Sequence, residues 1–129
     1  MLGFEVYIFP KSHYIADPKV WEREERWKHL LAAWSTGLGG LKWIDDLVKK
    51  GEAIDLNIGG EVLLCLYGTK LSTIKHVLKG NIPKPDDPPV IGEDYTLPSG
   101  FIGDVEIHES RIAECSEDEE IIIEAWDQS

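Results

Sequence analysis

The sequence predicts an α+β fold, with a largely antiparallel twisted sheet of about five strands and three helices packed on one face. Three observations lead to this prediction. Segments that alternate apolar and polar residues, as strands do, lie at both ends of the chain. Segments with apolar residues three or four apart, as in amphipathic helices, lie between them. Short glycine-rich turns separate neighbouring segments, which favours hairpins and therefore antiparallel pairing.

The chain begins with a predicted strand, and two predicted helices follow it. Apolar side chains at positions 4, 6 and 8 suit a strand with one buried face, closed by Pro10. Asp17-Pro18 suits a helix start, and the glycines at 37–40 suit its end. One apolar stripe predicts that this first helix packs on the core; its members are Val20, Trp27, Leu31 and Trp34. A second helix is expected at 41–50, with inward-facing Leu41, Ile44, Leu47 and Val48.

The middle of the chain predicts a hairpin and a third helix. Residues 53–58 and 61–67 flank Gly59-Gly60, a good two-residue turn, and the second arm is apolar on both faces, as in a central strand. The third helix is expected at 71–79, with inward-facing Leu71, Ile74, Val77 and Leu78, and it should stop at Gly80. The proline-rich stretch at 83–89 predicts an irregular loop that continues to about Gly100.

The C-terminal segment predicts strands. Residues 101–107 alternate, and the alternation breaks near Glu109-Ser110, which predicts a bulge or a break. After a charged turn at 116–119, residues 120–127 should complete a hairpin, with Ile121, Ile123 and Ala125 on one face. At 129 residues the whole chain, 1–129, is expected to form a single domain.

The charge is strongly asymmetric. The formal net charge is −11, yet residues 1–84 carry 10 acids and 12 bases, while residues 85–129 carry 14 acids and one base, Arg111. Such a field repels nucleic acid and attracts basic partners. The N-terminus lacks the pattern of a signal peptide, and there is no apolar run near the ~18–20 residues that span a bilayer. We therefore expect a cytoplasmic protein that binds neither nucleic acid nor membrane.

No motif for catalysis, a metal or a cofactor is present, so the chain is expected not to be an enzyme. The four histidines show no metal-binding spacing, and Glu106, His108 and Glu109 are better read as solvated strand residues than as a metal site. A Cys115–His108 nucleophile pair is conceivable, but nearby carboxylates would raise the pKa of the thiol, which opposes reactivity. Gly37–Gly40 follows a helix and lacks the spacing of a phosphate loop.

The acidic C-terminal third is therefore the candidate functional region. Its expected partner-binding residues are the carboxylates of this third together with two aromatic anchors: Glu93, Asp94, Tyr95, Asp104, Glu106, Glu109, Glu114, Glu117, Asp118, Glu119, Glu120, Glu124, Trp126 and Asp127. For Trp126, packing against the edge of the sheet is the favoured alternative to an exposed anchor. The carboxylates have a second interpretation with equal weight, since charged turns and strand faces also protect sheet edges from aggregation.

In overall type the chain resembles the immunity proteins of bacterial toxin systems, of the colicin or contact-dependent growth inhibition kind. The features that carry the resemblance are small size, the one-sided acidity of residues 85–129 and the lack of a catalytic constellation. The resemblance implies stoichiometric inhibition of a basic, nuclease-type toxin domain, whose substrate phosphates the carboxylates would imitate. No cofactor is expected, and the sequence does not tell whether the chain self-associates.

Two alternatives remain open. One is a small enzyme or ligand-binding domain, for which a deep cleft with converging histidine and carboxylate side chains should be found. The other is an accessory subunit of a larger complex, for which a broad apolar patch should be exposed.

Overall fold

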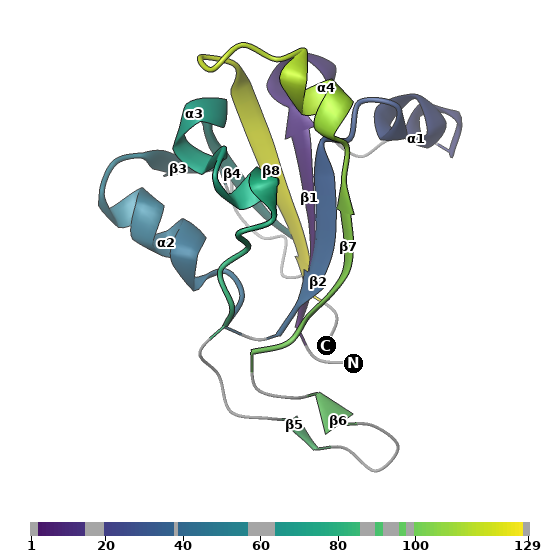
Figure 1. Cartoon of the computed structure of the whole chain (residues 1–129). Helices are drawn as coiled ribbons and strands as arrows, with labels where there is room; N and C mark the ends of the chain where they lie inside the picture. Colours follow the sequence, from purple (N-terminus) through teal and green to yellow (C-terminus); the bar gives the residue numbers. More distant parts are fainter. Residues whose placement is uncertain are drawn as a thin grey trace.

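The computed structural model describes residues 3–14, 20–37, 39–56, 64–85, 90–91, 96–97 and 100–127. Its centre is a six-stranded sheet in the order β3-β4-β8-β1-β2-β7, and every strand pair in it is antiparallel. The strands are β1 (Phe4–Pro10), β2 (Ala32–Thr36), β3 (Ala53–Asp55), β4 (Leu64–Lys70), β7 (Ile102–Ile107) and β8 (Glu120–Asp127). A small pair, β5 (Val90–Ile91) and β6 (Thr96–Leu97), lies apart from the sheet (Figure 1). The predicted α+β class with a largely antiparallel sheet is confirmed.

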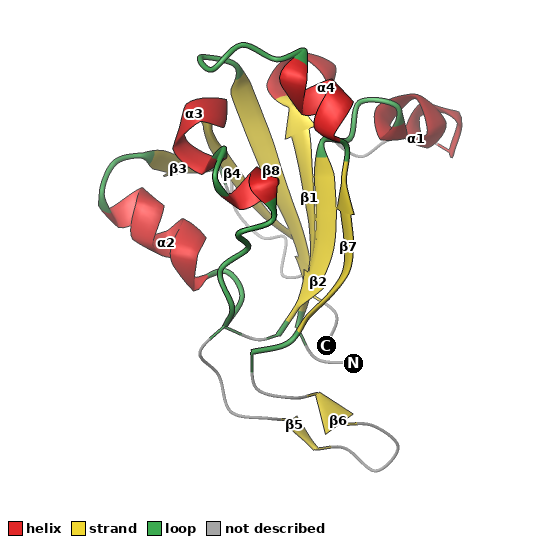
Figure 2. Cartoon of the chain, viewed as in Figure 1, coloured by secondary structure: helices red, strands yellow, loops and turns green. Residues whose placement is uncertain are grey.

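Short helices join the strands. They are α1 (Val20–Trp27), α2 (Lys42–Lys49), α3 (Leu71–Ile74) and α4 (Glu109–Ala113), with the 3-10 turns η1 (Lys11–His13) and η2 (Val77–Lys79). Figure 2 shows α2 and α3 on the same side of the sheet, with α1 lying away from them beyond β7. The second predicted helix corresponds to α2, and the third corresponds to α3 followed by η2. Gly80 ends η2 in the left-handed conformation, at φ 99°.

The main core lies between one face of the sheet and α2, α3, η2 and α4. Val6, Ile8, Ile121, Ile123 and Ala125 point into it from the two central strands, and all five are fully buried. Leu71, Ile74, Val77 and Leu78 close it from the helical side, as their spacing predicts. The predicted face of the last strand, with 121, 123 and 125 inward, is therefore confirmed.

The first helix is much shorter than predicted. It ends at Trp27, and Ala32–Thr36 form β2, which pairs with β1 from Phe4↔Thr36 to Ile8↔Ala32. All five residues of β2 are buried, because both faces of the sheet are covered at this position. Trp34 is in the core as predicted, but Trp27 is 39% exposed, so its predicted core position is wrong. The α1 helix also packs on the opposite face from the other helices, beside Phe9, Leu30 and Ala33.

The strand pairing differs from the predicted hairpins at the C-terminal end of the chain. Strand β8 lies between β4 and β1, at the centre of the sheet, and does not pair with β7. The predicted turn at Gly59-Gly60 lies outside the described residues, but β3 and β4 do pair, with Ala53 opposite Thr69. Strand β4 has a neighbour on each side, as its apolar sequence predicts.

Strand β7 forms one edge of the sheet and carries a bulge. Ala33 pairs with Glu106 and Ser35 with Gly103, so Asp104 and Val105 together oppose one residue of β2. Asp104 has φ 50°, a conformation that aspartate tolerates better than most residues. A bulge of this kind twists an edge strand away from further pairing. Beyond His108 the strand ends and α4 begins, so the predicted break is confirmed and is a helix.

Candidate protein-binding surface

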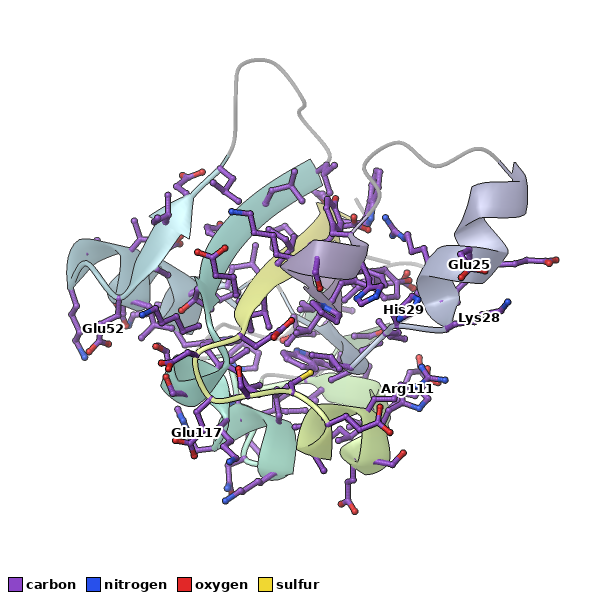
Figure 3. All side chains as sticks on the ribbon, turned by 90° about the horizontal axis from the view of Figure 1, so that it is seen from above. Glu25, Lys28, His29, Glu52, Arg111 and Glu117 are labelled. Atoms are coloured by element: carbon purple, nitrogen blue, oxygen red, sulfur yellow. The ribbon has the colours of Figure 1, made fainter. Side chains whose placement is uncertain are left out.

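Eight of the predicted carboxylates lie along one continuous segment. We call them the acidic face; they are Asp104 and Glu106 on β7, Glu109 on α4, Glu114, Glu117, Asp118 and Glu119 after it, and Glu120 at the start of β8. Seven are exposed and Glu119 is half-buried. Figure 3 looks down on this end of the molecule, with Glu117 and Arg111 labelled on opposite sides of it.

The turn after α4 is held by the start of α3. The backbone N–H groups of Leu71 and Ser72 donate to the carbonyl oxygens of Glu119 and Glu117, at 2.9 and 3.0 Å. The first amides of a helix have no partner within the helix, so they are available for such contacts. The N–H of Glu119 donates to Ser116 at 3.0 Å and closes the turn. The acidic residues of this turn are therefore presented on an anchored backbone.

Half of the acidic face is already paired with bases or hydroxyls. Glu106 contacts His108 at 2.8 Å, Glu117 contacts Lys75 at 3.1 Å, and Glu120 contacts Lys11 at 3.3 Å. The hydroxyl of Ser12 donates to Glu119 at 3.4 Å. The other four carboxylates make no hydrogen bond or ion pair within the described part of the chain; they are Asp104, Glu109, Glu114 and Asp118.

The single base of this segment, Arg111, does not neutralise these four side chains. Its Nη1 donates to the carbonyl oxygens of Trp27 and Leu30, at 3.1 and 2.9 Å. The guanidinium therefore holds the turn between α1 and β2. Arg111 is therefore not paired with any of these four carboxylates, which face solvent.

Glu124 is not part of this surface, contrary to the prediction. It is 1% exposed and lies on the face of β8 that packs against α1. Arg26 donates to it from Nη1 at 3.0 Å and from Nη2 at 2.5 Å. Tyr14 Oη and Trp126 Nε1 each donate at 2.7 Å. Burial, followed by the hydrogen bond to Glu124, raises the pKa of Tyr14.

Trp126 packs instead of standing free. Its indole N–H is bound to Glu124, and the side chain is partly buried at the end of β8, next to half-buried Asp127. Of the two interpretations of Trp126, packing is the one that this geometry favours. The predicted residues Glu93, Asp94 and Tyr95 lie outside the described residues.

The described side chains form no group that could hold a metal ion. Within them, no three histidine, cysteine or acidic side chains are close enough to share a metal ion. Cys65 and Cys115 are free thiols, and the Cys115 Sγ donates to the carbonyl oxygen of Arg111 at 3.4 Å. Burial, and then Glu119 and Glu114, raise the pKa of the Cys115 thiol, as the surrounding charges predict. None of the described helices has both the length and the apolar character needed to cross a membrane.

Three features of this region could not be predicted from the sequence. His13 and His29 stack on one another, with ring centroids 3.9 Å apart. They line a hollow of about 440 Å³ together with Cys115, Arg111 and five further charged or apolar neighbours: Pro10, Lys28, Leu31, Glu114 and Glu119. On the other side of Arg111, the exposed ring of Trp27 lines a smaller hollow of about 310 Å³. The residues of each hollow come from distant parts of the chain, so spacing carries no signal for them.

Comparison of the chain with protein-family models, with curated protein sequences and with solved structures gives no match.

Proposed function

We propose that this chain is a protein-binding module that neutralises a basic partner, of the immunity-protein kind, and that the acidic face is its binding surface. The observation that carries the proposal is the group of four unpaired carboxylates at Asp104, Glu109, Glu114 and Asp118. Fixed negative charges on an anchored backbone raise the association rate of a basic protein and select against acidic ones.

Protection of the sheet edge explains only part of this charge. Asp104 and Glu106 flank the exposed Val105 on edge strand β7, where charge and the bulge together discourage pairing with another chain. Glu114 and Asp118 lie beyond the strand, after α4, where there is no edge to protect. A binding role accounts for both groups of carboxylates.

The accessory-subunit alternative lacks its expected feature in the described residues. The large apolar side chains that are most exposed there are Trp27, Ile54, Ile91 and Val105, and they come from four different elements. Ile54 does border an apolar hollow of about 360 Å³ with Leu56 and Ile122. Scattered single side chains of this kind are ordinary on a protein surface.

The enzyme alternative has one observation in its favour. The hollow beside the stacked histidines brings imidazole, thiol and carboxylate groups together. However, the imidazoles stack face to face, and burial raises the pKa of the thiol, so neither arrangement resembles an activated nucleophile. Binding therefore remains the function that the geometry supports best. With two free cysteines, we place this activity in the cytoplasm.

The test is affinity capture of the partner from the native host, followed by binding measurements with two matched variants. The first variant neutralises three unpaired members of the acidic face: Glu109→Gln, Glu114→Gln and Asp118→Asn. The control removes three acids elsewhere, so the net charge changes equally: Glu24→Gln, Asp46→Asn and Glu52→Gln. We expect a basic partner, bound at least about tenfold more weakly by the first variant only. Equal effects of the two variants, or capture of an acidic partner, would refute the proposal.

A further inference from the structure

Two histidines that are distant in sequence form a contact between η1 and the turn after α1. The rings of His13 and His29 lie 3.9 Å apart at 18° to each other, which is a stacked arrangement. His13 is the last residue of η1, and Nδ1 of its ring lies 3.1 Å from the hydroxyl of Ser12. His29 follows α1, and its side chain is 33% exposed. Both rings are therefore within reach of solvent protons.

Through η1 the stack is connected to the acidic face. Lys11 forms an ion pair with Glu120 at 3.3 Å, and Ser12 donates to Glu119 at 3.4 Å. These two residues and His13 make up the whole of η1. A movement of His13 away from His29 therefore displaces the residues that contact the end of the acidic face.

The charges around the stack act in both directions. Glu25 lies 3.9 Å from Nε2 of His29, and Glu114 and Glu119 line the same hollow, so these acids favour protonation. Lys28 and Arg111 line the hollow as well, and Lys11 is the first residue of η1. These three bases oppose protonation of the histidines. Burial, and then His13, lower the pKa of His29, while Glu25 raises it.

One proton on the pair leaves a cation stacked on a neutral ring, which is a tolerable contact. Two protons place like charges about 4 Å apart, a distance at which repulsion is appreciable even in a polar environment. Because the fold lowers the pKa of His29 below its ordinary value of 6.5, the unfolded chain binds more protons than the folded chain once the pH falls below that value. The stabilisation of the fold by the neutral His29 ring is therefore fully present above about pH 6.5, and it is lost as the pH falls through the lowered pKa.

We propose that the His13–His29 stack is a pH-sensitive contact, which holds η1 against the α1–β2 turn while at least one imidazole is neutral and opens when both are protonated. Opening loosens the contacts of Lys11 and Ser12 with the acidic face and adds positive charge beside Glu119. Both effects weaken the binding of a basic partner at acidic pH. This last step rests on the proposed function, whereas the opening is a property of the free chain.

The decisive experiment is an NMR titration of the histidine rings in the free, full-length chain. In the unsubstituted chain we expect the titration midpoint of His29 to lie below the ordinary histidine value. The His13→Asn variant should raise the titration midpoint of His29 towards its ordinary value, and His13→Lys, with a permanent charge, should lower it. His76→Asn is the control, because His76 is exposed in the turn between α3 and η2.

Hydrogen exchange reports the opening itself. The amide of Tyr14, which donates to the carbonyl oxygen of Lys11 at 3.2 Å, should lose protection as the pH falls through the lowered pKa of His29. A His29 midpoint unchanged in both His13 variants, or a Tyr14 amide whose protection does not depend on pH, would overturn the proposal. A partner that binds the acidic-face variant normally would instead overturn the proposed function and leave these results unaffected.

Discussion

The buried ion pair between Arg26 and Glu124 fixes α1 against the sheet, and removal of either charge should destabilise the fold strongly. The two side chains are 6% and 1% exposed, and they lie 98 residues apart in sequence. Removal of one partner of such a pair costs about 3–5 kcal/mol, because the remaining charge has lost its counter-ion and has no water to replace it. Since a domain is typically stable by only about 5–15 kcal/mol, either single substitution removes a large share of the total.

A double-mutant cycle separates the interaction from the effects of each substitution. We expect Arg26→Met and Glu124→Leu each to lower the free energy of unfolding by about 3–5 kcal/mol. The double variant should lose less than their sum, with a coupling energy of up to about 3 kcal/mol. The exposed pair Lys28–Glu25, whose side chains are 69% and 57% exposed, is the matched control and should couple by at most about 0.5 kcal/mol.

Urea unfolding at neutral pH, monitored by tryptophan fluorescence, gives the free energy of unfolding of all these variants under one condition. The aromatic surroundings of Arg26 provide a second readout, since its guanidinium lies 4.6 Å from the Phe9 ring centroid and 5.5 Å from that of Trp27. Fluorescence of the folded state should therefore change when Arg26 is replaced. Single substitutions that each cost less than about 1 kcal/mol, or a coupling no larger than that of the surface pair, would refute this role of the ion pair.

Two further predictions concern the core and the thiol. Gly40→Ala should destabilise the chain by about 1–3 kcal/mol, because a Cβ at this position would lie 2.2 Å from two side-chain atoms of Thr36. The same urea assay measures this loss, and an unchanged unfolding midpoint would contradict the close packing. The raised pKa of Cys115 predicts that, in a Cys65→Ser background, iodoacetamide modifies it more slowly than a free cysteine at pH 7.5 and that the rate still increases above pH 9. A rate that reaches its plateau below pH 8.5 would show that the thiol is activated instead.

Local signals in the sequence predict most of the elements. Gly51 and Gly80, with φ 78° and 99°, follow α2 and η2, where helix-stop glycines are expected. The alternation of residues 120–127 also predicts which side chains of β8 face the main core. Helix ends and strand faces are determined mainly by residues that are close in sequence. A sequence pattern can therefore predict them.

Strand β2 was not predictable in the same way. Trp27, Leu31 and Trp34 have helical spacing, yet the chain leaves the helix at Trp27 and enters a strand that is buried on both faces. A fully buried strand does not alternate, so its short apolar run is indistinguishable from one side of a helix. Tertiary pairing with β1 decides the conformation, and no local signal reports that pairing.

The sequence predicts where along the chain the acidic surface lies, but it does not predict which of the acidic residues are exposed there. An acidic residue on a strand is most often exposed, so the sequence predicts that Glu124 lies on the surface with its acidic neighbours. Its burial depends on Arg26, and contacts over such a sequence distance leave no trace in spacing. The stacked histidines were missed for the same reason, since one precedes α1 and the other follows it.

The most direct test of the acidic face is the association rate with the captured partner as a function of ionic strength. The account predicts a rate that falls steeply as salt increases, because steering depends on unscreened charge. It also predicts that the Glu109→Gln, Glu114→Gln, Asp118→Asn variant associates at least about tenfold more slowly at low salt, while the matched control stays close to the unsubstituted chain. An association rate indifferent to both salt and the acidic-face substitutions would contradict it.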